Sequence, residues 1–385
     1  MKEKLLCLFA LFLPLEQILF YLFDIDTILK PYRFFLVLAL IFTFLDKSFL
    51  KNKLNNVFKS FFFIFTYGFL MGFFRIALGK GSLDYLTNGS IHFLLGLIII
   101  YLLSNITNKK LLYKIFNYFI IGLLISSIYG LFIFIFSPGQ TYRLKGFFNN
   151  PNHIAFTINF ISPFLIYNIK NKKNILYIIS FLFLTMIVVL SGSRTGMLIQ
   201  ILIFIYSIII FSRNIFNIIK TIFITFISYY FILTPILGLN NRFLDRYEFD
   251  NLKEGAGRWD IIDAAMSLGF DTFFMGVGIG QYRFYHLDYL SSNAYSTVLD
   301  FELSTHNHFL DLLINFGFIS FFIFSFFLIK VFSFLFKNRK KEFSKFGLMI
   351  LCILILSSFS QEMLIFPAFW IVISLLSTYN FFSYD

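Results

Sequence analysis

Long apolar blocks separated by short polar breaks dominate the chain. A membrane-spanning helix needs about 20 mostly apolar residues, fewer when its ends snorkel, and about twelve blocks of this kind follow one another. They lie near residues 4–23, 33–46, 58–77, 90–103, 115–136, 153–169, 175–191, 196–211, 221–238, 308–330, 346–361 and 364–381. The pattern predicts an all-α, polytopic integral membrane protein with about twelve transmembrane helices.

One stretch between the ninth and tenth blocks, residues 239–305, lacks a strong apolar run. A connection of this length is usually functional. Within it, Gly257–Leu268 has helical character, and Gly269–Gly280 reads as a glycine-rich turn that leads into the aromatic stretch Tyr282–Tyr285. The pattern divides the chain into N-terminal transmembrane helices, transmembrane helices with an outer arginine motif, a long loop, and C-terminal transmembrane helices: 1–140, 141–238, 239–305 and 306–385.

Composition excludes the water-soluble classes. Hydrophobic residues make up 58% of the 385 residues and charged residues 14%, and the 61 phenylalanines outnumber all 32 Lys and Arg and 20 Asp and Glu residues taken together. A single soluble core does not bury that much apolar surface. The blocks therefore face lipid.

The net charge of +12 is divided between two sides of a membrane. One set of alternate breaks carries 20 bases and four acids, and the rest of the chain carries 12 bases and 16 acids. By the positive-inside rule the first set is cytoplasmic, with both termini inside. The long loop is outside and acidic, which argues against a nucleic-acid partner because it would repel phosphate backbones.

The first outer arginine that needs an explanation is Arg194. It lies in Ser191–Gly196, Ser-Gly-Ser-Arg-Thr-Gly, which interrupts two apolar blocks with almost no polar loop. An arginine there is costly if it faces lipid, and flanking glycines expose backbone N–H groups that form an anion site with a guanidinium. The alternative is that Arg194 snorkels to the headgroups.

Arg258 opens the predicted loop helix, in Gly-Ala-Gly-Arg-Trp. It is a second candidate for binding an anion. The alternative is an ion pair with Glu254 or Asp263, which is common in an acidic loop.

Arg143 precedes the turn Gly146–His153, Gly-Phe-Phe-Asn-Asn-Pro-Asn-His. Asn-Asn and Asn-Pro are ordinary turn chemistry, so this turn alone carries little functional signal. The other arginines of the long loop are interpreted as a solvated face: Arg242, Arg246 and Arg283.

His306 and His308 stand at the start of the tenth block, in His-Asn-His-Phe-Leu. On a helix His306 shares a face with Leu310, Leu313 and Gly317 and points away from His308. A histidine at the mouth of a span suits a general base near neutral pH. A His-x-His pair also suits metal, but an i,i+2 pair does not share a helical face and no Cys or HExxH pattern accompanies it; we expect no metal and no cofactor.

Two glutamates in apolar surroundings, Glu16 and Glu362, are candidates to pair with an outer arginine or to line a polar cavity.

In these motifs the chain resembles the bacterial O-antigen ligase and O-antigen polymerase superfamily. The family's elements occur in its order: the turn 146–153, Ser-Gly-Ser-Arg-Thr-Gly (191–196), Gly-Arg-Trp (257–259), Gly-Val-Gly-Ile-Gly (276–280) and His-Asn-His-Phe-Leu-Asp-Leu-Leu-Ile-Asn-Phe-Gly (306–317). The resemblance is strongest over about residues 140–325. Members usually have an acidic residue before the last glycine, where this chain has Asn315 and Phe316.

The resemblance implies a metal-independent, inverting glycosyltransferase of the bacterial inner membrane that acts at the periplasmic face. Its donor is an undecaprenyl-pyrophosphate-linked glycan, and its acceptor is lipid A-core for a ligase or a second lipid-linked repeat for a polymerase. The family's motif arginines match Arg194 and Arg258, which would hold the pyrophosphate, and its histidine matches His306, which would deprotonate the acceptor. Arg143 and Asn307 are supporting candidates.

The competing hypothesis is a flippase or exporter of lipid-linked oligosaccharide. Such proteins usually have internal repeats and charges within several spans. This chain shows no repeat of fixed period, and its polar residues collect at the outer breaks. We therefore favour the glycosyltransferase.

Overall fold

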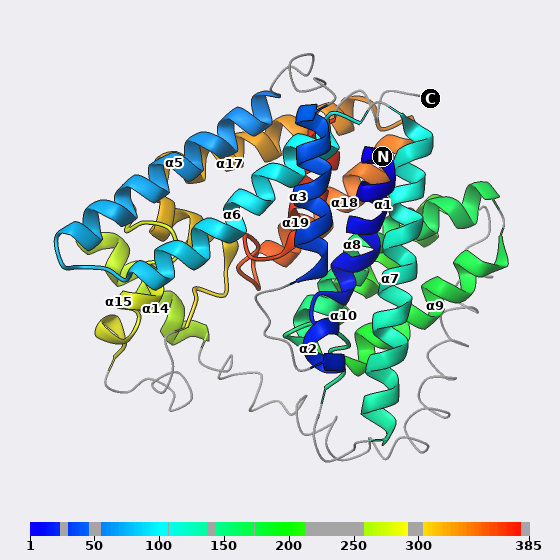
Figure 1. Cartoon of the computed structure of the whole chain (residues 1–385), viewed down its shortest axis with the longest axis horizontal. Coiled ribbons are helices and arrows are strands. Elements are labelled where there is room, and N and C mark those ends of the chain that lie inside the picture. Colours follow the sequence, from blue (N-terminus) through cyan, green and yellow to red (C-terminus); the bar gives the residue numbers. More distant parts are fainter. Residues whose placement is uncertain are drawn as a thin grey trace. The chain divides into compact units, whose positions relative to one another are not determined.

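The computed structural model describes residues 1–23, 30–45, 55–106, 108–136, 143–172, 174–211, 258–291 and 303–378, and these are helices and connections with no strand among them (Figure 1). The contacts divide the chain into two compact units. Unit 1 comprises Met1–Phe9, Pro31–Ile115 and Glu254–Asp385, and unit 2 comprises Ala10–Lys30 and Phe116–Lys253.

Helices of membrane-spanning length and composition confirm the all-α, polytopic fold. Four of the described helices are long and apolar enough to cross a bilayer: α5 (Asn56–Ala77), α6 (Leu83–Ser104), α7 (Lys109–Phe136) and α17 (His308–Lys337). Other described helices are α3 (Pro31–Leu45), α8 (Pro151–Lys172), α9 (Ile175–Leu190), α10 (Arg194–Phe211), α18 (Glu342–Ser358) and α19 (Pro367–Ser377). The ninth expected span, 221–238, lies outside the described residues.

The first apolar block differs from the single span expected over residues 4–23. It consists of α1 (Lys2–Phe12), the 3-10 turn η1 (Leu13–Leu15) and α2 (Ile18–Phe23). Pro14 interrupts the helix because it has no N–H to donate. Glu16 follows in the break between α1 and α2 and is only 7% exposed.

The core of unit 1 is aromatic. Phe61 of α5 and Phe93 of α6 pack edge-on against Trp370 of α19, with ring centroids 5.5 Å and 5.0 Å apart. Gly96 makes this possible, since a Cβ there would lie 2.1 Å from the indole. The indole N–H donates to the carbonyl of Leu364 at 2.8 Å, so its polar atom is satisfied within the core.

α17 is interrupted at Gly317, where φ is 76° and ψ is 169°. The glycine-rich segment of the loop packs against this kink. Val277 N donates to Ile314 O at 2.9 Å, and Gly278 N donates to Asn315 O at 2.8 Å. The segment thus satisfies two carbonyls that the interruption frees from the helix, and it fixes the first part of α17.

Polar side chains link the helices of unit 2. Asn159 of α8 donates to the carbonyl of Gly196 of α10 at 3.0 Å, and Gln200 of α10 donates to the hydroxyl of Thr185 of α9 at 2.8 Å. Interhelical hydrogen bonds of this kind hold helices together where the apolar surroundings supply no other polar partner. They fix the turn between α9 and α10, which carries Arg194.

Candidate functional site

The loop helix α14 (Arg258–Asp271) begins at Arg258, which confirms the helix predicted from Gly257. Ile261, Ala265 and Leu268 form its buried face and pack with Leu310 and Ile314 of α17. Gly269 near the end of α14 lies against Ile314, while Ile261 near its start belongs to the same buried cluster as Leu310 near the start of α17. The two helices therefore run in the same direction, and their amino ends meet.

His306 stands outside α17, in a bend two residues before the helix begins. Its φ of 48° is in the left-handed region, which side chains other than glycine rarely adopt. The expectation that His306 shares a helical face with Leu310, Leu313 and Gly317 is therefore wrong. Because the bend precedes the helix, it directs the imidazole independently of the helical periodicity.

Asn307 holds the helix end that follows His306. Its side-chain oxygen accepts from Leu310 N at 3.1 Å, and the Thr305 hydroxyl donates to the Asn307 carbonyl at 3.0 Å. This is an N-cap. The geometry gives Asn307 a positioning part beside His306.

Burial and positive charge keep His306 neutral. Burial lowers the pKa of His306 below its ordinary 6.5. The guanidinium of Arg258 lowers it further, the Glu362 carboxylate raises it, and Arg283 and His286 add smaller lowering effects. A neutral imidazole at physiological pH is the form that accepts a proton. The packing of α14 against α17 places the two motif residues predicted for base and anion binding in unit 1 at neighbouring helix ends.

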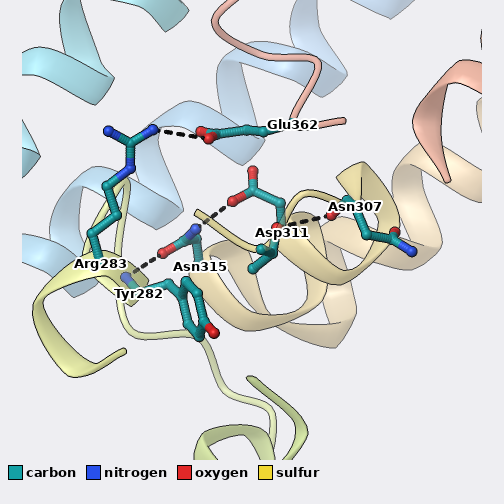
Figure 2. A network of polar contacts seen from close by, with 7 residues as sticks. Tyr282, Arg283, Asn307, Asp311, Asn315 and Glu362 are labelled. Atoms are coloured by element: carbon teal, nitrogen blue, oxygen red, sulfur yellow. Dashed lines mark hydrogen bonds and ion pairs between the residues drawn. The ribbon is translucent and has the colours of Figure 1, made fainter. Parts of the chain in front are cut away.

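A polar network includes two of the charged groups that act on His306, Arg283 and Glu362 (Figure 2). Arg283 of α15 (Tyr282–Tyr285) donates to the Glu362 carboxylate at 3.1 Å, and their side chains are 35% and 12% exposed. The interpretation of Arg283 as part of a solvated loop face is therefore wrong, because a partly buried carboxylate binds it. The expected pairing of Glu362 with an outer arginine is confirmed.

Asn315 connects α17 to α15 within this network. Its amide donates to the buried Asp311 carboxylate at 2.6 Å, and its carbonyl oxygen accepts from Tyr282 N at 2.9 Å. Figure 2 shows the Asp311 carboxyl group between Asn315 and Glu362. An amide performs both tasks at once, whereas an ionised carboxylate has no N–H for Asp311. Asn315 therefore bridges a donor on α15 and an acceptor on α17.

Tyr282 and His286 complete the support of the loop helices. The Tyr282 hydroxyl donates to Ile261 O at 2.9 Å and lies 3.0 Å from His286 Nδ1. Burial raises the pKa of Tyr282, so the phenol stays protonated. The Tyr282–Ile261 hydrogen bond ties α15 to α14.

His308 is a core residue. It is fully buried, and its ring lies 5.0 Å from the rings of both Phe324 and Phe369, measured between centroids. Within the described residues neither ring nitrogen has a hydrogen-bond partner. The ring therefore contributes shape and packing.

We expect His308→Phe to leave transfer activity unchanged and to keep or raise the melting temperature. A buried polar group without a partner costs about 1–3 kcal/mol, and an apolar ring of similar shape removes that cost. Thermal unfolding in detergent and an activity assay at equal protein amounts check this. An inactive but folded variant would show that the His308 nitrogens take part in the chemistry.

The turn that precedes Arg194 is held in unit 2 by Arg143. Arg143 Nε donates to Ser191 O at 2.7 Å, and its Nη2 donates to Asn152 Oδ1 at 2.7 Å. Gly192 has a φ of 59°, and a Cβ there would touch the Arg143 side chain at 3.5 Å. Arg143 thus joins the 146–153 turn to the turn before Arg194, which gives the supporting candidate a positioning part.

Arg194 itself is the first residue of α10 and is partly buried. The hydroxyl of the preceding residue, Ser193, accepts from Gly196 N at 3.2 Å, so the Ser193 side chain caps α10. The helix end and the guanidinium together form a positive site.

A cavity of about 330 Å³ lies beside Arg143. Lys145, Tyr21 and Tyr129 line it as well, and the Lys145 ammonium lies 5.6 Å from the centroid of the Tyr21 ring.

Glu16 lies in the same unit, where its carboxylate binds Lys30 at 3.1 Å and accepts from Asn149 N at 3.4 Å. The ion-pair partner of Glu16 is therefore a lysine and not one of the arginines. The Glu16 carboxylate also holds the 146–153 turn through Asn149.

Residues 179–325 match the family model described as O-antigen ligase. Over this segment the chain is similar to the O-antigen ligase family. The match confirms, for these residues, the resemblance to the O-antigen ligase and polymerase superfamily that the motifs indicated. No curated protein matches the chain.

The matched segment supports O-antigen ligase or polymerase function in general, for a multi-pass bacterial membrane protein that handles lipid-linked glycans. It covers less than half of the 385 residues but contains Arg194, Arg258 and His306. The 146–153 turn and Glu362 lie outside the matched segment.

Proposed function

We propose that the protein is a polyprenyl-pyrophosphate-dependent glycosyltransferase that moves a glycan from undecaprenyl pyrophosphate to an acceptor hydroxyl, of lipid A-core or of a second lipid-linked repeat. The observation that carries this is the packing of the start of α14 against the start of α17, which brings the helix ends that carry Arg258 and His306 together within the segment similar to O-antigen ligases. The resemblance supplies the substrate class.

His306 acts as the general base. The acceptor oxygen attacks the anomeric carbon of the donor, its proton passes to the neutral imidazole, and the new carbon–oxygen bond forms as the bond to pyrophosphate breaks. The bonding electrons leave with undecaprenyl pyrophosphate, and the sugar inverts at the anomeric carbon. A positioned base contributes about 10²–10⁴-fold.

The leaving pyrophosphate needs stabilisation of its negative charge. Arg258 supplies a guanidinium, and the converging amino ends of α14 and α17 add their positive dipole ends. Arg194 supplies a second guanidinium from the turn between α9 and α10. In this proposal the arginines take the part that a metal ion has in other transferases.

The charge distribution supports a periplasmic location for this chemistry. The breaks with excess lysine and arginine orient both termini to the cytoplasm of the inner membrane, and the loop with Arg258 and His306 then lies on the opposite face. An undecaprenyl-linked donor reaches such a site from within the bilayer.

Purified protein tests the proposal directly. We expect it to consume a polyprenyl-pyrophosphate-linked glycan in the presence of acceptor, to release polyprenyl pyrophosphate, and to do so equally with and without EDTA. Thin-layer chromatography of the lipid products measures both. An unchanged donor would contradict the enzyme and favour an exporter, and inhibition by EDTA would contradict the role given to the arginines.

The acceptor is distinguished in cells by a clean deletion read on a lipopolysaccharide gel. Core bearing a single repeat identifies a polymerase. Bare core together with accumulated lipid-linked polymer identifies a ligase.

A further inference from the structure

The end of α14 and the turn that follows it, residues 270–275, expose large apolar side chains. Phe270 is 64% exposed, Phe273 82% and Met275 46%. Phe273 and Phe274 have φ values of 51° and 52°, the left-handed region that glycine or asparagine normally occupies in a turn exposed to water. Two phenylalanines in this conformation strain the backbone. An apolar environment for their side chains would offset that cost.

The turn is hydrogen-bonded to two helices of membrane-spanning length. Phe318 N of α17 donates to Phe274 O at 2.9 Å, and the Tyr67 hydroxyl of α5 donates to Met275 O at 2.6 Å. Tyr67 precedes the end of α5 at Ala77 by about 15 Å along the helix, at 1.5 Å per residue. The carbonyl of Met275 therefore lies beside the middle of α5.

The faces of α5 and α17 next to the turn are themselves apolar and exposed. On α5 they include Leu70 and Phe74, at 59% and 57%, and on α17 Phe318 and Phe322, at 40% and 64%. In a helix that crosses a membrane, such side chains contact lipid. Phe273 and Met275 adjoin these faces, because the hydrogen bonds attach the turn at Tyr67 and Phe318.

Polar groups mark how far the segment 270–275 extends into the bilayer. Asp271 within it is exposed, and its carboxylate accepts from the Tyr289 hydroxyl at 2.9 Å. Trp259 is 64% exposed at the other end of α14. Tryptophan is enriched in the headgroup region, so the start of α14 lies there. Because α14 runs in the same direction as α17, its carboxyl end lies on the acyl-chain side.

We propose that residues 270–275 form a membrane anchor, with Phe270, Phe273 and Met275 inserted among lipid acyl chains of the leaflet that contains the Ala77 end of α5. The loop expected to stand in water is thereby attached to the bilayer. The anchor holds α14, and with it Arg258, at a set height above the acyl chains. The proposal rests on the fold and is independent of the proposed function.

Site-directed fluorescence quenching tests it. Cys7 and Cys352 are replaced by serine, and bimane is attached to Phe273→Cys in liposomes made with brominated or ordinary phosphatidylcholine. The matched control is Asp288→Cys, an exposed site of the same loop. We expect several-fold stronger quenching of position 273 than of position 288 by brominated lipid, and the reverse order with aqueous iodide.

Quenching of position 273 by iodide as strong as at position 288 would overturn the anchor. Protection from both quenchers would also overturn it, because another protein surface would then cover the turn. If Phe273→Cys does not fold, Phe270→Cys reports on the same anchor from within α14, where the backbone is helical.

Discussion

His306→Asn is expected to fold normally and to lose about 10²–10⁴-fold in the rate of glycan transfer. Asparagine adopts the left-handed backbone of position 306 readily, so the bend before α17 is kept. Its amide does not accept a proton at the operating pH, so the acceptor hydroxyl loses its base. The initial rate with purified protein, at equal amounts of folded variant and parent, measures the effect.

Asparagine is a better test than alanine at this position. Alanine carries a Cβ into a φ of 48° and has no polar group to stabilise the turn, so a loss of activity would mix strain with missing chemistry. His308→Phe is the matched control on the neighbouring histidine, since its ring only packs. Activity of His306→Asn within a few-fold of the parent would remove the base from the mechanism.

The helix at Arg258 and the division of the chain into apolar helices and polar breaks were predicted from the sequence because both depend on local signals. A glycine-flanked start and an apolar periodicity are visible within a dozen residues. The interruption at Gly317 was not predicted, since it depends on loop residues 277 and 278 hydrogen-bonding to α17. The left-handed bend at His306 is likewise a tertiary feature, and for that reason the assumed helical face was wrong.

The polar network that includes Arg283 and Glu362 was missed for a related reason. Arg283 and Glu362 are 79 residues apart, and no local pattern distinguishes Arg283 from the other loop arginines. Asp311 and Asn315 did leave a signal: a carboxylate and an amide at i,i+4 within an apolar helix, which is costly unless they bond to each other. That pair points to the polar interior of the site without identifying its partner across the fold.

Arg258→Gln is expected to lower the transfer rate about 10²–10³-fold, the range for removing one group that stabilises developing negative charge. It should also shift the pH profile. The acid limb of kcat/KM follows protonation of the free base, and the guanidinium of Arg258 lowers the pKa of His306. Without that charge the pKa rises toward 6.5, so activity is lost at higher pH than in the parent.

Two variants separate this electrostatic effect from general damage to the site. Arg258→Lys keeps the charge but loses the bidentate geometry, so its rate should fall while its acid limb stays where the parent has it. Glu362→Gln removes the carboxylate that raises the pKa of His306, so its acid limb should move to lower pH, opposite to Arg258→Gln. Profiles of kcat/KM from pH 4 to 8, a range of about two units on each side of a histidine pKa, measure all three. Acid limbs that move in the same direction in Arg258→Gln and Glu362→Gln would show that the titrating group is not the imidazole between them.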